Sequence, residues 1–372
     1  MKNIAQCIRL LTFTICLFWC CLSINAKEYT GKILKGNDTS IRYIGRTQEH
    51  LDGSVSFDWV GTYLETTFTG GTLSVRLSET GTSYYNVHVD GELYRVVKAC
   101  GIDTLINFVS GVDQKPHSLR IQKRTEGEFG KTTIHNFLLS PSGVLKEAPK
   151  VRNRHIEFIG NSLTCGFGTE GKDRNESFRL ETENCDLSFS AIIARYFNAD
   201  YTLIAHSGRG AVRNYGDSVR VSMNTMKDKM LCTFDENPDI LWNFSTYHPD
   251  LVVVNLGTND FSLEPQPYKS EFVKAYTQIL KQLRQYYGDI PVVCIYSSTI
   301  TAPVYSFFEE AVTDMKDEKI HLLHIKEGIM NMTTDLGSVW HPNYNGQRKI
   351  AMSLIPYIST IMNWDLLDKI VK

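Results

Sequence analysis

The sequence predicts a chain of two domains, an all-β domain followed by an α/β domain. Between residues 55 and 139, apolar and polar residues alternate along short runs separated by turn residues such as Gly70-Gly71. From residue 155 onward, short apolar runs instead alternate with longer segments of helical periodicity. A polar stretch with proline and glycine, residues 140–150, separates the two patterns. Because strands repeat every two residues and helices every 3.6, this change of period marks a change of fold class.

The first half is expected to form a β-sandwich or barrel, because short strands separated by turns at this spacing are typical of both folds. The Asp90-Gly91 pair stands between two alternating runs, YYNVHV and ELYRVV. It predicts a tight hairpin, since both central residues of a type I′ turn need positive φ. The other alternating runs are SVSFDW, TYLETTF, LSVRL, HSLRIQKR and TIHNFLL.

The second half is expected to form a parallel sheet covered by helices. Runs such as LVVVNL are apolar on both faces, which is typical of strands with helices on either side. Residues 270–287 predict a helix with one apolar stripe, made by Phe272, Ala275, Tyr276, Ile279, Leu280 and Leu283. The other predicted strands are HIEFIG, YTLIA, PVVCIYSS and IHLLHI, and the other helices are SFSAIIARYF and NGQRKIAMSLIPYISTIM.

The first residues have the anatomy of a secretory signal peptide. Lys2 and Arg9 precede an apolar stretch, residues 10–22, which is followed by small residues ending at Ala26. That stretch is shorter than the roughly 20 residues that a membrane span needs, so export is favoured over a transmembrane anchor. Lipid attachment is the alternative, although the Leu-Phe-Trp triplet before Cys20 lacks the small residues expected there.

These patterns divide the chain into a signal peptide at 1–26, a β domain at 27–148 and an α/β domain at 149–372. The mature protein is expected to be secreted, periplasmic or on the cell surface, with no transmembrane segment. The 39 basic and 41 acidic residues nearly cancel, leaving a formal net charge of -2. This balance excludes strong attraction to nucleic acid or to an anionic membrane, so a neutral partner is expected.

The cysteines and histidines do not form a metal-binding pattern, and we expect neither a metal nor a cofactor. There is no C-x-x-C or H-x-x-x-H spacing, and His321 and His324 in a strand would point to opposite faces. Cys165 and Cys185 could bridge in an oxidising compartment or remain buried thiols, and both readings stay open. Four cysteines lie in the signal peptide, Cys7, Cys16, Cys20 and Cys21; the others are Cys100, Cys165, Cys185, Cys232 and Cys294. These five are an odd number, so at least one has no intramolecular partner.

Two polar residues follow predicted strands of the α/β half. Ser162 comes just after the strand in FIGNSLTCG, and Asn259 follows the strand in LVVVNLGTND. In open α/β sheets, ligands bind beyond the carboxyl ends of the strands, so both positions are candidates for a site. The alternative is structural: Asn161 and Ser162 could simply cap a helix, and Asn259 could belong to a turn.

Four loops together carry residue types that favour catalysis. They are FIGNSLTCGFG with Ser162, AHSGRGAVRNYGD with Gly208, VVVNLGTNDFS with Asn259, and GSVWHPNYNGQRKIA with His341. These loops resemble the four sequence blocks of the SGNH (GDSL-type) hydrolases, and the four residues stand at the signature positions. A serine needs a base such as histidine to become a nucleophile. The negative charge that then develops needs donors, here expected from the Ser162 and Gly208 N–H groups and the Asn259 amide.

Within that superfamily the chain resembles carbohydrate esterase family 2. The stretches that carry the resemblance are FDWVGTYLETTFTG, VHVDGELYRV, HSLRIQKRTEGEFG, FIGNSLTCGFGTEG, HSGRGAVRNYGD and WHPNYNGQ. The resemblance implies an N-terminal jelly-roll sandwich and a C-terminal SGNH-hydrolase domain with a flavodoxin-like, three-layer parallel sheet. It also implies a secreted serine esterase that removes O-acetyl groups from plant cell-wall polysaccharides such as xylan or glucomannan.

The sequence departs from the superfamily pattern near the proposed base. The usual aspartate three residues before the histidine is replaced by Ser338, and Val339 stands two residues before it. Asp335 is the nearest upstream carboxylate, six positions away, and is expected to be a loop residue rather than the acid of a triad. The family resemblance implies a Ser-His dyad in which a backbone carbonyl orients the imidazole. We therefore expect Ser162 and His341 to act as a dyad. A second departure is Asn161, which stands where most members have aspartate.

Other residues are weaker candidates for substrate contacts. Trp340 could stack on a sugar ring or pack beneath its loop. Arg209 and Arg213 flank Gly208 and could hold the loop or line the cleft. Trp59 is assigned to the core of the β domain or to the domain interface.

Two other functions remain open. A lipase-like or thioesterase hydrolase would need apolar stretches around the site, whereas TEGKDRNES and HPNYNGQ are polar. A carbohydrate-binding protein with an inactive hydrolase domain would bind the same glycan without cutting it. The four signature residues speak against that function, and the missing acid keeps it open.

Overall fold

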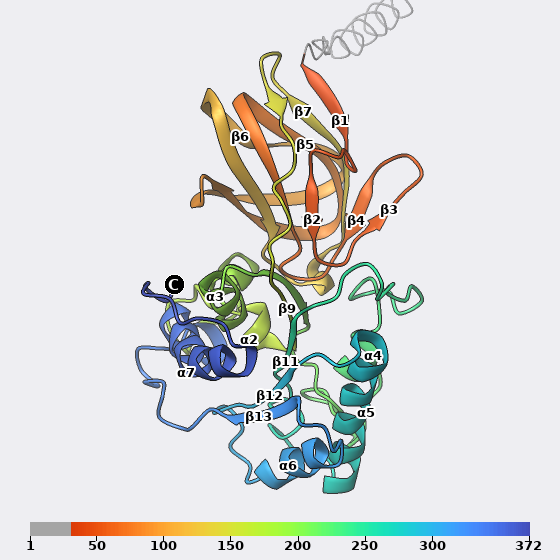
Figure 1. Ribbon diagram of the computed structural model, residues 1–372, viewed down its shortest axis with the longest axis vertical. Helices are drawn as coiled ribbons and strands as arrows, with labels where there is room; N and C mark the ends of the chain where they lie inside the picture. Colours follow the sequence, from red (N-terminus) through yellow and green to blue (C-terminus); the bar gives the residue numbers. More distant parts are fainter. Residues whose placement is uncertain (1–30) are drawn as a thin grey trace, which may run out of the picture. The chain divides into compact units, whose positions relative to one another are not determined.

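The computed structural model describes residues 31–372, so the predicted signal peptide with its cysteines lies outside the described residues. The described chain contains two β-sheets, one in each half of the sequence (Figure 1). No helix within 31–372 is long and apolar enough to span a lipid bilayer.

The N-terminal sheet is antiparallel throughout, as the alternating runs predict. Its strand order is β2-β5-β7-β4-β3, with β1 paired to β7 and both β6 and β8 paired to β5. The strands are β1 (Lys32–Lys35), β2 (Arg42–Ile44), β3 (Gln48–Glu49), β4 (Val55–Phe57), β5 (Tyr63–Val89), β6 (Glu92–Lys123), β7 (Thr132–Leu139) and β8 (Val144–Leu145).

Long, bent strands close this sheet around its own core. Strands β5 and β6 pair with repeated register shifts, so that the end of β5 contacts both the start and the end of β6. The β5–β6 hairpin turns at Asp90 and Gly91, whose φ angles of 54° and 83° confirm the predicted turn. Phe68, Phe108 and Phe137 lie in the buried core of this sandwich.

The C-terminal sheet is parallel, with strand order β10-β9-β11-β12-β13. Helices α3 and α7 pack on one face and α5 and α6 on the other, which confirms the three-layer α/β fold (Figure 1). The strands are β9 (His155–Gly160), β10 (Asp200–Ala205), β11 (Leu251–Val254), β12 (Val292–Tyr296) and β13 (Ile320–His324). The helices are α2 (Ser162–Cys165), α3 (Phe189–Tyr196), α4 (Met226–Lys229), α5 (Lys269–Tyr287), α6 (Tyr305–Thr313) and α7 (Tyr344–Met362).

Four short 3-10 turns complete the secondary structure of the described residues. They are η1 (Gly127–Phe129), η2 (Leu180–Thr182), η3 (Cys185–Leu187) and η4 (Ser338–Trp340). Of these, η1 follows the last strand of the long β5–β6 hairpin, and η4 immediately precedes His341. Both turns therefore lie in loops that carry residues of interest for the site.

The sandwich is joined to the α/β domain by buried side chains. Trp59 is fully buried in a hydrophobic cluster made largely by the α/β domain, and its Nε1 donates to the Cys232 carbonyl at 3.4 Å. The buried Arg46 guanidinium donates to the carbonyls of Met230 and Cys232 at 2.7 and 2.8 Å. Trp59 was expected either in the core of the β domain or at the domain interface, and it lies at the interface.

Replacing Trp59 tests how much this interface contributes to stability. Trp59→Ala should lower the free energy of unfolding by about 3–5 kcal/mol, because it empties a fully buried site. The matched control is Trp340→Ala, which removes the same side chain from an exposed position and should cost less than about 1 kcal/mol. Urea unfolding of both variants measures the difference. Equal losses would mean that Trp59 does not hold the interface.

Candidate functional site

Ser162 stands at the carboxyl end of β9, the strand second from the edge of the parallel sheet. The strand ends at Gly160, and Asn161 is the N-cap of α2, accepting a hydrogen bond from the Leu163 N–H at 3.2 Å. Ser162 is therefore the first residue of that helix, and it is 7% exposed. Asn161 therefore caps the helix, as the structural alternative expected, and Ser162 still lies at the end of the strand, where a site was expected.

The imidazole of His341 joins Ser162 to a backbone carbonyl. Its Nε2 lies 2.9 Å from Ser162 Oγ, and its Nδ1 lies 2.8 Å from the carbonyl oxygen of Val339. Because a carbonyl can only accept, Nδ1 carries the proton and Nε2 is free to accept the Ser162 hydroxyl proton. Burial lowers the pKa of His341 from its ordinary value of 6.5, against the raising effect of its backbone hydrogen bonds. The ring is therefore neutral, as a base must be.

A left-handed turn presents the Val339 carbonyl to the imidazole. Val339 has φ 51° and ψ 46°, and Trp340 follows with φ 60°. Such a conformation costs a non-glycine residue on the order of 1–3 kcal/mol and persists only where the surroundings impose it. Here the N–H groups of Ser338, Val339 and Trp340 donate to carbonyls in the loop after α2, those of Gly168, Glu176 and Arg174.

Close packing explains why a small residue occupies position 338. Ser338 is fully buried against two glycines of the loop after α2. A Cβ added at Gly171 would come within 2.1 Å of Ser338 Oγ, and one added at Gly168 within 2.8 Å of Ser338 Cβ. The larger aspartate of the superfamily pattern does not fit this contact without displacing the loop.

The carboxylate of Asp335 is bound elsewhere. It accepts hydrogen bonds from the Asn331 N–H at 2.6 Å and from Lys349 Nζ at 2.5 Å. Among residues 31–372, the hydrogen-bond partners of the imidazole are Ser162 and Val339. Asp335 therefore ties its own loop to α7.

Two further loops bring potential donors to the carboxyl edge of the sheet. Gly208 follows β10 with φ 76°, and its N–H donates to no group within residues 31–372. Asn259 follows β11, and its Nδ2 donates one proton to the Arg209 carbonyl at 2.7 Å. The second proton of that amide stays available.

Asp260 is a structural residue of this site that the sequence pattern did not single out. Its fully buried carboxylate accepts the N–H groups of Ala211, Val212 and Arg213 at 2.8–3.0 Å. These bonds hold the segment 206–213, termed here the glycine loop. Its position next to Asn259 is the feature of the sequence that could have identified it.

The arginines and the tryptophan near the site differ in exposure. The Arg213 side chain is fully buried and donates to the Asp217 carbonyl at 2.7 Å, so it holds the loop rather than lining a cleft. Arg209 is partly exposed. Trp340 is 55% exposed, with the Arg174 guanidinium 4.5 Å from its ring centroid. Its ring thus lies at the surface, beside His341.

The two cysteines considered for a bridge are free, buried thiols in the structure. Burial raises the pKa of both Cys165 and Cys185, so neither is poised as a nucleophile.

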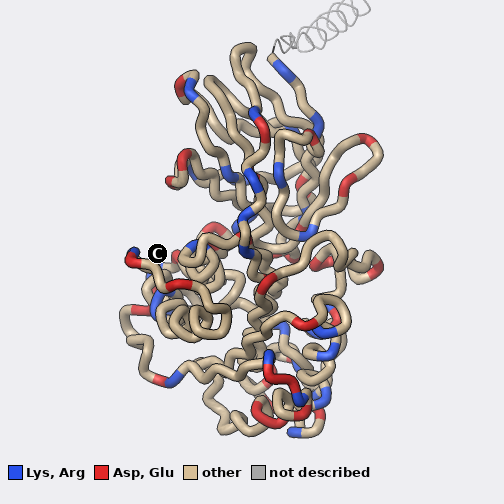
Figure 2. The backbone as a smooth tube through the Cα atoms, viewed as in Figure 1, with Lys and Arg blue, Asp and Glu red and all other residues tan. Residues whose placement is uncertain are grey.

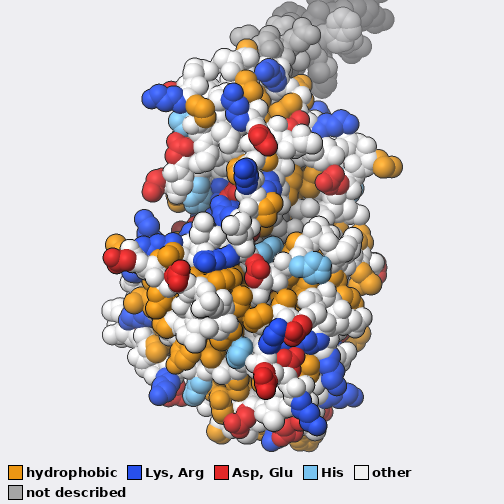
Figure 3. Space-filling view, viewed as in Figure 1, with side chains coloured by type: hydrophobic (Ala, Val, Ile, Leu, Met, Phe, Trp, Pro, Cys, Tyr) orange, Lys and Arg blue, Asp and Glu red, His pale blue; other side chains and the backbone are white. Residues whose placement is uncertain are grey.

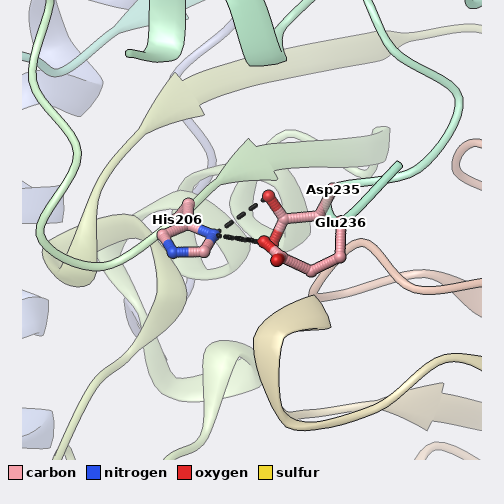
Figure 4. A group of neighbouring side chains, drawn as sticks. All are labelled: His206, Asp235 and Glu236. Carbon is pink, nitrogen blue, oxygen red and sulfur yellow. Dashed lines mark hydrogen bonds and ion pairs between the residues drawn. The ribbon is translucent and has the colours of Figure 1, made fainter. Parts of the chain in front are cut away.

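The side chains of His206, Asp235 and Glu236 lie close together, at the spacing of a metal site (Figure 4). His206 Nδ1 lies 2.8 Å from Asp235, and Lys229 Nζ lies 2.9 Å from both carboxylates. Burial opposes protonation of His206, but Asp235 beside it raises the pKa of the imidazole overall. A metal ion would have to displace that proton and sit beside an ammonium group, so the cluster is an ion-pair network.

Comparison with known proteins places each half of the chain in a family. Residues 43–149 match the model of the carbohydrate esterase 2 N-terminal domain, and residues 158–349 match the GDSL-like lipase/acylhydrolase family.

Individual relatives match along most of the chain. The cellulase/esterase CelE of Acetivibrio thermocellus is 31% identical over 88% of this chain, which spans 40% of that longer protein. An acetylxylan esterase/glucomannan deacetylase of Cellvibrio japonicus is 27% identical over 82% of this chain and 85% of its own length. The structure of a family two carbohydrate esterase from Clostridium thermocellum in complex with cellohexaose superposes with a TM-score of 0.81. It is 31% identical, and the match covers 87% of this chain and all of that one.

Substitutions at Ser338 test the packing argument for its loop. Ser338→Asp should lower the free energy of unfolding by about 2–4 kcal/mol, because it forces a larger, charged group into a filled site. Ser338→Ala is the matched control and should be close to neutral, since the buried Ser338 Oγ has no hydrogen-bond partner among the described residues. Thermal unfolding of both variants measures the effect. An aspartate tolerated as well as alanine would contradict the packing argument.

Proposed function

Because the chain belongs to carbohydrate esterase family 2, we propose that it is a serine esterase that removes O-acetyl groups from plant cell-wall polysaccharides such as xylan or glucomannan. The observation that carries the proposal is the 2.9 Å contact between His341 Nε2 and Ser162 Oγ at the carboxyl edge of the parallel sheet. We further propose that residues 1–26 direct export, which brings the enzyme to an extracellular, periplasmic or cell-surface substrate.

The reaction follows from the protonation state of the dyad. Ser162 Oγ attacks the acetyl carbonyl carbon while His341 Nε2 takes the hydroxyl proton, and the Val339 carbonyl stabilises the imidazolium through Nδ1–H. His341 then gives this proton to the departing sugar oxygen, which leaves as a hydroxyl group, and acetyl-Ser162 remains. Water attacks this ester with His341 again as base, acetate departs, and the Ser162 hydroxyl is restored.

Negative charge forms on the carbonyl oxygen in both tetrahedral intermediates. The N–H groups of Ser162 and Gly208 and the free amide proton of Asn259 are the proposed donors to that oxygen. Each such donor contributes on the order of 10²- to 10³-fold in rate, because it is already oriented before charge develops. The bond from Asn259 to the Arg209 carbonyl keeps this amide in place.

A neutral glycan suits the charge distribution of the protein. Acidic and basic residues are interspersed along both halves of the chain, and the face seen in Figure 3 has no continuous patch of one sign (Figures 2 and 3). Exposed Trp340, beside the proposed base, offers an apolar ring face on which a sugar could stack. Partly exposed Arg209 is the other proposed contact, through hydrogen bonds to sugar hydroxyls.

One observation favours a second candidate, a protein that binds glycan without cutting it. A relative's structure contains cellohexaose, a sugar chain that carries no acetyl ester. Cleavage and binding must therefore be measured separately.

Acetate release tests the proposed function. Wild type should release acetate from acetylated xylan, acetylated glucomannan and 4-nitrophenyl acetate, and Ser162→Ala and His341→Ala should each lose at least about 10³-fold in kcat. Asp335→Asn keeps the hydrogen bonds of its loop and should stay within a few-fold of wild type. Equal loss in Asp335→Asn and His341→Ala would contradict the dyad. Wild type that releases no acetate but is retarded on glycan gels would be a binding protein.

The pH dependence tests the protonation state of the base. Only the neutral imidazole accepts a proton, so activity is present above the pKa of His341 and falls as the pH drops through it. Because burial lowers that pKa, the acidic limb of kcat/KM should lie below the ordinary histidine value of 6.5. A pH profile with 4-nitrophenyl acetate measures the limb. A midpoint above 6.5 would mean that the imidazole is stabilised in its charged form.

A further inference from the structure

We infer that Glu126, a residue of the β-sandwich domain, is a positioning residue of the active site: its carboxylate holds Ser207 and thereby places the Gly208 N–H. The inference rests on the proposed function, in which Gly208 is a donor to the developing oxyanion. It assigns the β-sandwich a direct part in the hydrolase site.

Glu126 binds the glycine loop through two hydrogen bonds to one residue. It lies just before η1 and is fully buried. Its Oε2 accepts the Ser207 N–H at 2.5 Å, and its Oε1 accepts the Ser207 hydroxyl proton. A carboxylate that accepts two donors from one residue fixes both the position and the orientation of that residue, and such charge-assisted bonds are the stronger kind.

The position of Ser207 makes this contact relevant to catalysis. Gly208 comes directly after it and has a left-handed backbone conformation with φ 76°. Downstream of Gly208, the loop is held by Asn259 through the Arg209 carbonyl and by Asp260 through three N–H groups. Upstream, Glu126 holds the residue adjacent to Gly208. Removing the upstream bonds would let the Gly208 N–H move, and a displacement of about 1 Å can cost 10²-fold in rate.

The segment that carries Glu126 is itself held in place. Lys123 Nζ donates to the carbonyls of Thr125 and Glu126 at 2.7 and 2.8 Å. The next residue, Gly127, packs so closely on Asp235 that an added Cβ would lie 2.7 Å from the Asp235 side chain. These contacts hold Glu126 in the sandwich, and its carboxylate in turn binds the glycine loop.

The segment that carries Glu126 is also connected to His341, the proposed base, through a row of aromatic rings. Phe129 stacks on Phe178 with a centroid distance of 5.8 Å, and Phe178 stacks on Phe167 at 3.9 Å. Phe167 in turn lies 4.6 Å from the His341 ring. One loop of the sandwich thus contacts the donor side of the site through Glu126 and the base side through aromatic rings.

Two substitutions of matched size test the role of Glu126. Glu126→Met keeps the volume but accepts no hydrogen bond from Ser207, so kcat for 4-nitrophenyl acetate should fall on the order of 10²-fold while KM changes less than about 3-fold. Glu126→Gln can still accept the N–H and donate to the Ser207 hydroxyl, and should recover most of that loss. Glu147→Met makes the same change at an exposed position of the β domain, is the control, and should behave as wild type.

The rate of labelling of Ser162 by a fluorophosphonate separates this inference from the choice of substrate. The probe reacts with an activated serine whatever the natural acyl group, and its phosphoryl oxygen uses the same donors. Labelling of Glu126→Met should slow in parallel with kcat. A wild type that is labelled but releases no acetate would contradict the proposed substrate. The labelling rates of the Glu126 variants would still decide the role of Glu126.

Folding is checked by circular dichroism and thermal unfolding. If Glu126→Met does not fold, Glu126→Asp decides, because it keeps the charge but is one methylene too short to reach Ser207, and it should lose kcat as well. A folded Glu126→Met with the kcat and labelling rate of wild type would overturn the inference. A loss that Glu126→Gln does not restore, with KM rising in step, would also overturn it, since it would show general damage to the site. Wild type that is neither labelled nor active would remove both proposals.

Discussion

The hydrogen bond between His341 Nδ1 and the Val339 carbonyl is the constraint on which the site depends. Because a backbone carbonyl rather than a carboxylate contacts Nδ1, the orientation of the imidazole is set by chain conformation rather than by a side chain. That conformation is a left-handed turn at a β-branched residue. It exists because three consecutive N–H groups of the turn are bound by the loop that follows the nucleophile.

This arrangement connects the loop after α2 to both residues of the proposed dyad. It follows α2, whose first residue is Ser162, and it supplies the carbonyls that hold the turn before His341. Ser338 packs against Gly168 and Gly171, which have no side chains, so the loop after α2 and the turn before His341 lie in close backbone contact. Within residues 31–372, the buried Ser338 Oγ has no hydrogen-bond partner, so packing rather than polar contacts holds this side chain between the loops.

The two domains share one continuous interior at their junction. Trp59 and Arg46 of the sandwich are buried among residues of the α/β domain, and Asp58 accepts the Asp235 and Glu236 N–H groups at 2.7 and 3.1 Å. Burying these charges is tolerated because each finds donors or acceptors across the junction. The contact of Glu126 with the glycine loop belongs to the same interface. A mutation in the sandwich can therefore be expected to change the catalytic rate.

By itself the sequence determined the features that depend on local pattern. Periodicity separated the sandwich from the parallel sheet, Asp90-Gly91 specified its hairpin, and the loops after β9, β10 and β11 placed Ser162, Gly208 and Asn259 at one edge. The tertiary structure alone decided what holds those residues. The family resemblance implied that a backbone carbonyl orients His341, but every residue has a carbonyl, so only the structure identified it as that of Val339. Glu126 lies 81 residues from Ser207, so its contact leaves no local trace in the sequence. Asp335 showed the converse: it is near His341 in sequence, yet its carboxylate is bound by Lys349 because folding, not spacing, selects partners.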